Sequence, residues 1–350
     1  MSRAQSMPYS ISWLDHVIDW VDRLPGPWWL LYLAAAALSA FVFVAIHLAA
    51  AEGSTVSVRF AAFLAAQPML VLGIGHAIRN SARRSLQKFR PLLPWDDDAV
   101  GAAAFEVANA PARPSLAAAV ILAIVVPPLM LGIPGAGLDE RFAALGFAPE
   151  PASVVATWAC AAALSAAIGG VFTHFVHQLR VIAQLFAAVP KLDLYRLEPV
   201  YAFSSTTALG AVLLTIDNYL WYVAQPALLN DPFSLVMGAG SATLALTAFA
   251  WPLWGAHRLL AGEKAHALGA NGTAFRKLAE ELRDEVARGQ LERMDQVNKA
   301  MVSVELERDV LSRIPTWPWH AETFRTIIAA IFLPLIVWLA QYLLGKAIGA

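Results

Sequence analysis

The stretch Ile314-Pro-Thr-Trp-Pro-Trp-His320 decides how the last third of the chain is arranged. It stands between a highly charged segment and a mostly apolar run over 324–344. Prolines interrupt helices, and tryptophan favours the depth of lipid headgroups because its ring is apolar while its N–H group needs a polar partner. We therefore interpret Trp317 and Trp319 as membrane-interface residues. The alternative is an aromatic pair that lines a ligand pocket.

The composition of the 350 residues indicates a membrane protein. Hydrophobic residues make up 58% of the chain and charged residues only 15%, against about 45–50% and about 25% in soluble domains. The net charge of -1 provides no concentrated basic surface, so we expect the lipid bilayer and no nucleic acid as a partner. A single cysteine, Cys160, excludes an internal disulfide and a multi-cysteine zinc site.

Seven segments are long and apolar enough to cross a bilayer, which takes roughly 20 mostly apolar residues. They are 27–49, 56–78, 115–137, 152–176, 203–224, 234–256 and 325–345. Prolines interrupt the third and the seventh, and such kinks persist in a bilayer where neighbouring groups satisfy the freed carbonyls. The sequence thus predicts an all-α fold, a polytopic integral membrane bundle of about seven transmembrane helices with a cytoplasmic helical extension between spans six and seven.

The positive charges predict the orientation of this bundle. Basic residues follow spans two, four and six, as Arg79, Arg83, Arg84, Lys88 and Arg90, then Arg180, Lys191 and Arg196, then the charged block between Arg258 and Arg313. The opposite connections are short and mostly acidic. Because cytoplasmic loops carry the excess of Lys and Arg, we expect a cytoplasmic N-terminus and an external C-terminus. An alanine-rich chain without a cleavable signal peptide is typical of a prokaryotic plasma membrane.

Four parts of the chain are expected: an N-terminal amphipathic interfacial helix over 1–26, a six-span bundle over 27–256, a cytoplasmic helical hairpin over 257–319 and the seventh transmembrane helix over 320–350. In the first, three aspartates lie opposite an apolar stripe, so it lies on the membrane or packs on the cytoplasmic loops. In the third, we expect a loop at Gly269-Ala-Asn-Gly272 and a break near Gly289. Its apolar stripes need a partner, which is the other helix, the other loops or a second copy in a homo-oligomer.

The strongest candidate for a ligand-binding or ion-binding site lies toward the outer end of span five. Its residues are Asp217, Asn218, Tyr219 and Tyr222. An ionisable group inside a membrane is costly and usually faces a cavity or a partner. We therefore expect Asp217 to contact a cation, a proton or a polar ligand, and the alternative is that it reaches the outer interface or receives hydrogen bonds from another span.

Histidines form a second group near the predicted cytoplasmic edge, namely His76, His174, His177, His257 and His320. The i, i+3 spacing puts His174 and His177 on one helical face, and such imidazoles can bind a metal or haem, or respond to pH. No carboxylate joins them at ligand-like spacing, so we expect neither a metal nor another cofactor. Small residues, as in Gly169-Gly170 and Gly238-Ala-Gly-Ser-Ala242, predict close helix packing.

The chain carries no Gly-rich phosphate loop, Gly-x-Ser-x-Gly or His-Glu-x-x-His motif, so we expect a non-enzymatic protein. Its predicted topology resembles that of insect odorant and gustatory receptor channels. Their last span ends in an apolar run followed by Gln and an aromatic residue, which Ile336-Val-Trp-Leu-Ala-Gln-Tyr342 resembles, although Leu333-Pro334 stands where their motif opens with Thr-Tyr. The resemblance implies an oligomeric channel or receptor-like protein. The alternatives are a monomeric solute or ion transporter and a membrane scaffold.

Overall fold

The computed structural model describes residues 8–50, 57–131, 147, 150–226, 232–289 and 291–319, together with positions 325, 328, 329 and 332. Helix accounts for 85% of the structure, and the described residues form no strand. The elements are α1 (Trp13–Asp22), α2 (Trp28–Ala50), α3 (Val58–Phe89), the short 3-10 helix η1 (Arg90–Leu92), α4 (Asp97–Ala108), α5 (Ala112–Leu131), α7 (Pro151–Ala187), α8 (Ala202–Ala224), α9 (Pro232–Arg288) and α10 (Leu291–Arg313).

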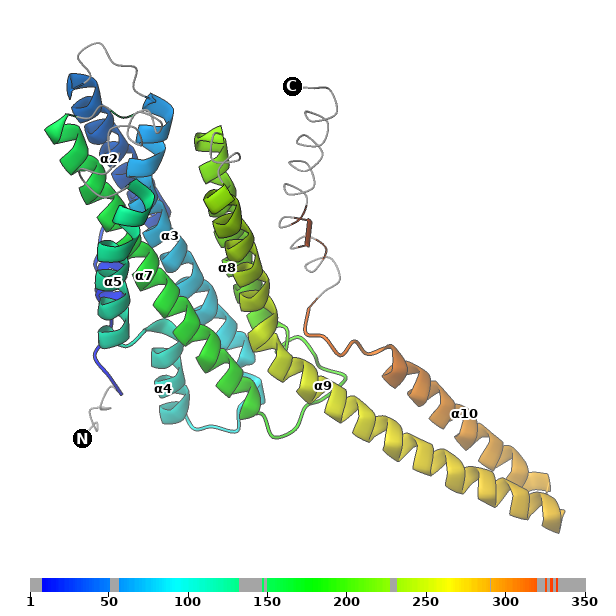
Figure 1. Cartoon of the computed structure of the whole chain (residues 1–350). Coiled ribbons are helices and arrows are strands. Elements are labelled where there is room, and N and C mark those ends of the chain that lie inside the picture. The colour runs from blue at the N-terminus through cyan, green and yellow to red at the C-terminus, as the bar shows by residue number, and fades with distance from the viewer. Residues whose placement is uncertain are drawn as a thin grey trace, which may run out of the picture.

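The long helices form a bundle in which helices that follow one another in the chain run in opposite directions, while α3 and α7, which pack together, run in the same direction (Figure 1). In Figure 1, α2, α3, α5, α7, α8 and the first part of α9 run side by side. The last turns of α3 and α7 and the connections that follow them lie together at the lower end of this view. The basic residues after predicted spans two and four lie partly in these last turns and partly in these connections. We refer to this end as the basic end and to the other as the opposite end.

Among the described residues, four helices are long and apolar enough to cross a membrane: α2, α3 with η1, α5 and α7. They begin within three residues of predicted spans one to four, but α3 and α7 continue 11 residues beyond the ends predicted at 78 and 176. Their outer faces carry large apolar side chains, such as Phe41 (74% exposed) and Ile124 (66% exposed), which lipid would cover. The apolar helices therefore indicate a membrane protein. Spans five and six coincide with α8 and the first part of α9 and stay predictions, and span seven lies outside the described residues.

Close packing explains the small residues of the bundle. A Cβ atom added to Gly169 of α7 would lie 2.8 Å from the carbonyl oxygen of Ala118 in α5, a separation that real Cβ atoms do not adopt. Gly170 faces the ring of Trp13 in the same way, and Gly238 of α9 faces the hydroxyl of Tyr222 in α8. The predicted close packing is therefore confirmed at Gly169, Gly170 and Gly238, but not at Gly240, where an added Cβ atom would have nothing within 4 Å.

Helix α9 is the longest element and leaves the bundle at the basic end. At about 1.5 Å per residue it is about 85 Å long, and it contains Pro252. It runs through 269–272 without interruption, so the predicted loop there is wrong. Glycine in a helix costs only about 1 kcal/mol relative to alanine, and Asn271 is held by α10, since its Nδ2 donates to the Val304 carbonyl (2.9 Å) and to Glu307 Oε2 (3.0 Å).

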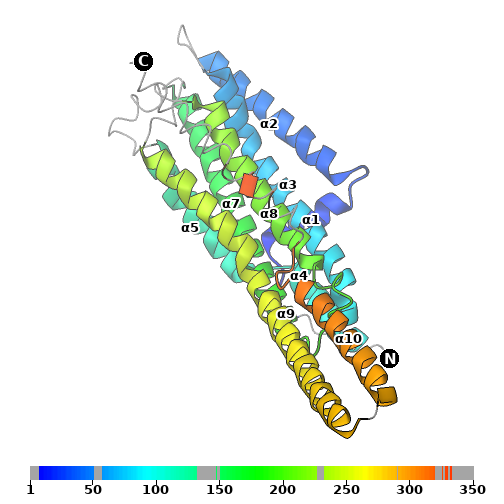
Figure 2. The same cartoon turned by 90° about the vertical axis from the view of Figure 1, so that its right-hand side faces the viewer.

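Helices α9 and α10 form an antiparallel hairpin that projects from the basic end (Figure 2). The chain reverses at Gly289, whose φ of 71° favours glycine, so the predicted break is confirmed. At the tip, Glu285 is buried and contacts Arg293 at 3.2 Å, whereas its apolar neighbour Val286 is 55% exposed. At the base, Lys264 Nζ donates to the carbonyl of Ile314 (2.8 Å) and so stabilises the end of α10. The boundaries of the four predicted parts stay predictions.

Candidate functional site

Helices α3 and α8 meet along an antiparallel seam that holds the candidate site. Near the opposite end, Arg59 Nε donates to the Ala224 carbonyl (3.1 Å), and the rings of Phe63 and Trp221 lie 5.2 Å apart. One turn further along each helix stand Gln67 and Asp217, and the Asp217 carboxylate faces the Gln67 side-chain amide.

Hydroxyl groups fix the same seam near the basic end. The Thr206 hydroxyl hydrogen-bonds with those of Ser81 (3.0 Å) and Ser85 (2.9 Å), and Ser85 Oγ donates to the Ala202 carbonyl (2.8 Å). Specific contacts on both sides of Gln67 and Asp217 therefore set the register of the two helices.

Gln67 and Asp217 are the part of the seam whose polar groups lack ordinary partners. Gln67 is completely buried, and neither atom of its amide makes a hydrogen bond. Asp217 is partly buried and makes no ion pair with any residue that the structure describes. The two side chains face each other without hydrogen-bond geometry. Our sequence analysis did not predict Gln67 as a site residue, although a polar residue before a proline in an apolar span could have indicated it.

Pro68 explains the polar contacts around Gln67. A proline inside a helix cannot donate to the carbonyl four residues earlier, which here is that of Leu64. The thiol of Cys160 in α7 donates to this carbonyl at 3.4 Å, and Ser39 Oγ of α2 donates to the next one, that of Ala65, at 2.8 Å. Helices α2, α7 and α8 thus each place a polar side chain at this level of α3.

Of the other residues of the predicted site, Tyr222 points away from Asp217. The hydroxyl of Tyr222 lies against Gly238 of α9, so it faces a different neighbour from Asp217. Asn218 and Tyr219 are partly buried on the same stretch of α8. The structure therefore gives Asp217 a new neighbour, Gln67, and does not gather Tyr222 with it, and the ligand-binding role of these residues stays a prediction.

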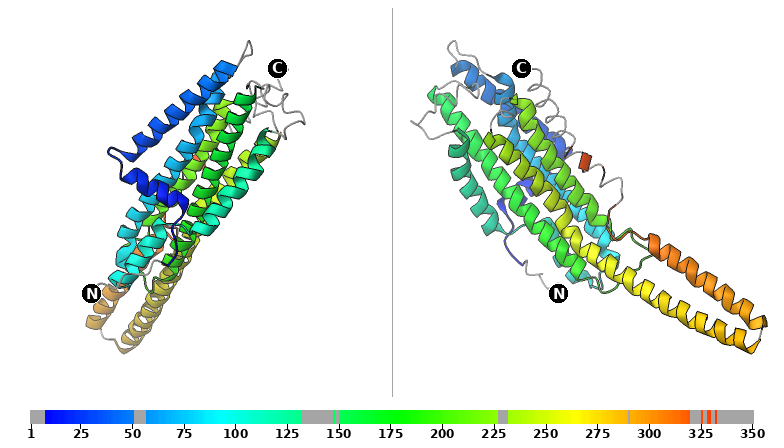
Figure 3. Two further views of the ribbon diagram at one scale, coloured as in Figure 1. Left: turned by 90° about the vertical axis from the view of Figure 1, so that its left-hand side faces the viewer. Right: turned by 45° about the vertical axis from the view of Figure 1, so that its right-hand side comes forward.

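A second polar cluster joins α1 to the bundle at the basic end. Helix α1 lies across α3 and α7 (Figure 3), and its three aspartates at 15, 19 and 22 share one side of the helix. Asp19 contacts Arg79 Nη2 at 2.7 Å, and Asp22 contacts His76 Nε2 at 3.1 Å. The acidic side of α1 thus packs on the bundle, which favours packing on protein over simple attachment to the membrane surface.

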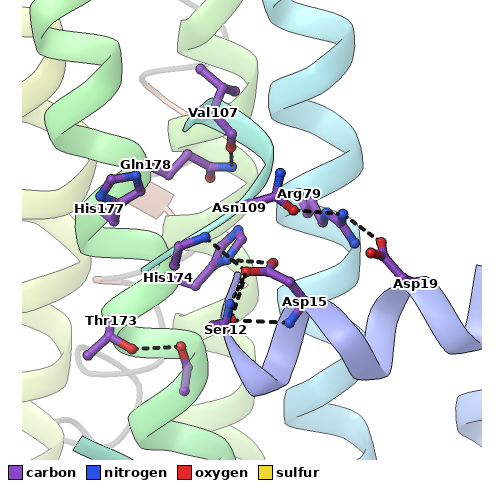
Figure 4. A network of polar contacts seen from close by, with 12 residues as sticks. Ser12, Asp15, Asp19, Arg79, Val107, Asn109, Thr173, His174, His177 and Gln178 are labelled. Atoms are coloured by element: carbon purple, nitrogen blue, oxygen red, sulfur yellow. Dashed lines mark hydrogen bonds and ion pairs between the residues drawn. The ribbon is translucent and has the colours of Figure 1, made fainter. Parts of the chain in front are cut away.

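Asp15 lies at the centre of this second cluster and is fully buried (Figure 4). Its carboxylate accepts from Ser12 Oγ (2.7 Å) and from the Ala110 N–H group (2.9 Å), and it lies 3.2 Å from His174 Nδ1. Burial acts to raise the pKa of Asp15, but the contact with His174 and these hydrogen bonds outweigh it, so the pKa lies below its ordinary value. Ser12 and Asp15 also form the capping box of α1.

Arg79 and His177 extend the second cluster. Arg79 is almost completely buried, and its Nη2 also donates to Asn109 Oδ1 at 3.0 Å. His177 contacts the hydroxyl of Tyr9 at 2.9 Å, and that hydroxyl donates to the Asn109 carbonyl at 2.8 Å. The predicted i, i+3 pair His174 and His177 therefore contacts the N-terminal segment of the chain.

The remaining histidines have separate environments. The ring of His257 stacks on Trp317 with 4.0 Å between centroids, and Trp317 stacks on Trp319 at 4.4 Å. His47, which our sequence analysis did not consider, lies 3.1 Å from the Thr157 hydroxyl. His320 lies outside the described residues. Within the part of the chain that the structure describes, no three His, Cys, Asp or Glu side chains gather as metal ligands. The membrane-interface role of Trp317 and Trp319 stays a prediction.

Comparisons of this chain with protein families, with curated proteins and with solved structures found no match.

Proposed function

We propose that this chain is a non-enzymatic subunit of an oligomeric membrane channel or receptor-like protein, and that copies assemble through the α9–α10 hairpin. The observation that carries this proposal is an apolar stripe on the free face of α10. Val302, Leu306 and Val310 recur every four residues, and they are 48%, 63% and 51% exposed. A stripe at this spacing covers one side of a helix.

The surroundings of the stripe favour a protein partner over lipid. Ion pairs flank it, Asp295 with Lys299 and Asp309 with Arg313, and an apolar centre with a charged rim is typical of a protein interface. The hairpin projects beyond the apolar part of the bundle (Figure 1), where water would otherwise contact the stripe. A second copy of α10 offers the same apolar surface.

The place of α10 in the chain connects assembly with a channel. Helix α10 ends at Arg313 and leads through Trp317 and Trp319 to the predicted seventh span. Copies joined along α10 would bring their seventh spans close to a common axis. The basic residues place the hairpin and the N-terminus on the cytoplasmic side in this proposal.

The first test is the mass of the particle in nanodiscs by native mass spectrometry. We expect a defined oligomer for the natural chain and a monomer when Val302, Leu306 and Val310 are all replaced by serine. The control replaces Glu305 and Arg308, which are exposed on another side of α10, by serine and should leave the oligomer intact. A monomeric natural chain would refute the proposal, and a stripe variant that still assembles would refute the interface.

A second measurement separates a channel from the other roles. The oligomer is reconstituted into planar bilayers, and currents are recorded with the natural chain and with the stripe variant. Unitary currents that need the oligomer support a channel. An oligomer without currents, with or without a range of tested ligands, would indicate a scaffold.

A second candidate function is a monomeric solute or ion transporter. It is favoured by the unpaired Asp217 and Gln67, which lie inside the bundle of a single chain, because intramembrane carboxylates often mark ion or proton pathways. A monomer in nanodiscs, together with cation-dependent uptake into proteoliposomes that Asp217→Asn abolishes, would favour this function over the first.

A further inference from the structure

We propose that Asp217 and Gln67 form a binding site for one small monovalent cation between α3 and α8. The site lies inside each single chain, so the proposal holds for a channel, a transporter or a scaffold and does not depend on assembly.

The charge of the site selects the class of ligand. Among the described residues no Lys, Arg or His forms an ion pair with Asp217, and the one neighbour that interacts with its carboxylate is the neutral amide of Gln67. An unpaired carboxylate is strongly disfavoured in a medium of low dielectric constant. One monovalent cation neutralises one carboxylate, whereas a divalent ion would leave an excess positive charge there.

The available atoms suit a hard cation. Asp217 offers two carboxylate oxygens, and Gln67 offers an amide oxygen that has no hydrogen-bond partner at zero exposure. Carboxylate and amide oxygens are the ligands that such ions prefer. Leaving a buried amide without partners is unfavourable, so a bound cation would stabilise both side chains at once.

The surrounding contacts hold the two side chains in place. Phe63 and Trp221 pack one turn away on one side, and the hydroxyls of Ser81, Ser85 and Thr206 bridge the helices on the other. The carbonyl freed by Pro68, that of Leu64, accepts from Cys160, and the next carbonyl, that of Ala65, accepts from Ser39. These contacts fix the positions of α2, α3, α7 and α8 around the site.

The site lies in the half of the bundle that is nearer to the opposite end. Asp217 lies about 10 Å along the axis from the end of α8 at Ala224, by the rise of about 1.5 Å per residue. Its side chain is only partly buried.

The test uses the full chain in detergent and follows thermal unfolding in choline chloride, NaCl and KCl at one ionic strength. We expect the midpoint of unfolding to rise with Na⁺ or K⁺ and to saturate, while choline, whose methylated ammonium group oxygen ligands cannot coordinate directly, has no effect. Asp217→Asn should remove the response. Gln67→Ala should weaken the apparent affinity by about tenfold, or about 1.4 kcal/mol.

The matched control is Glu150→Gln, which removes an exposed carboxylate at the start of α7 and should keep the full response. Circular dichroism and size-exclusion profiles establish that each variant is folded. The proposal would be overturned if the unfolding midpoint rose equally in choline chloride, or if the response to Na⁺ or K⁺ persisted in Asp217→Asn. It would also be overturned if the midpoint of the natural chain depended on pH but on no alkali cation, because Asp217 would then bind only a proton.

The oligomer mass is recorded on the same samples. A saturable cation response in a monomer would support the site while refuting assembly through the hairpin. An oligomer whose unfolding midpoint does not respond to Na⁺ or K⁺ would support assembly and refute the cation site.

Discussion

Two polar clusters lie along helix α3, and they differ in how their groups are paired. Around Arg79, the aspartates of α1 meet an arginine and histidines at 2.7–3.2 Å, so opposite charges lie side by side, although several buried nitrogen atoms of this cluster make no hydrogen bond. Around Gln67, the Asp217 carboxylate faces a neutral amide and forms no ion pair with a described residue. Neighbouring opposite charges suit a structural contact, whereas a carboxylate without an opposite charge inside a bundle indicates a place for a cation. The first cluster thus holds α1 in place, and the second is the candidate site.

The largest effect is expected from breaking the paired cluster at Asp15. Asp15→Ala leaves His174 and the Ala110 N–H group without their buried partner, and removing one member of such a pair costs about 3–5 kcal/mol. The free energy of unfolding in mild detergent measures this loss. His16→Ala, which changes the exposed neighbour on α1, should have almost no effect. Equal stability of the two variants would show that the cluster does not hold α1.

Acid should release α1 through the same carboxylate. Because the pKa of Asp15 is lowered in the folded protein, its contribution to stability is present above the ordinary pKa of about 3.9 and is lost as the pH falls through the lower folded value. Hydrogen exchange of 13–22 at pH 7 and at successively lower pH measures the release. In Asp15→Asn this dependence should disappear, and an unchanged acid transition in that variant would assign it to another group.

The smallest effect on stability is expected at Gln67, and here the substitution should not lower stability but leave it unchanged or raise it. Gln67→Leu replaces a buried amide that has no partner by an apolar side chain of similar size, which is nearly neutral or stabilising. In choline chloride the thermal midpoint should therefore stay the same or rise. The matched change in the paired cluster, Arg79→Met, should lower it. If the thermal midpoint fell by a similar amount in both variants, Gln67 would contribute to stability as Arg79 does, and the proposed difference between the two clusters would be wrong.

Much of the bundle could be predicted from the sequence, because apolar length and the distribution of basic residues reflect the bilayer directly. Helices α2, α3, α5 and α7 begin close to their predicted limits. The loop at 269–272 was predicted wrongly because local glycine content was weighed without the contact between Asn271 and α10. A contact between residues far apart in the chain is invisible to a local pattern.

The candidate site shows the same limit. Asp217 could be predicted because a carboxylate in an apolar span stands out by itself. Its neighbour Gln67 lies 150 residues earlier in the chain, and only the register of α3 against α8 brings the two together. In the same way, the sequence places the aspartates of α1 on one side of a helix. It does not show that they contact His174, Arg79 and His76, because only the fold brings these residues together.

Helix α9 also has a mechanical consequence. It crosses the bundle and continues as one helix to the tip of the hairpin, and Pro252 removes a hydrogen bond on the way, which makes it the natural pivot. About 54 Å of helix lies beyond that pivot, at about 1.5 Å per residue. A bend of about five degrees at Pro252 would move the tip by about 5 Å, so a small change in the tilt of the first part of α9 would become a larger displacement of the hairpin tip.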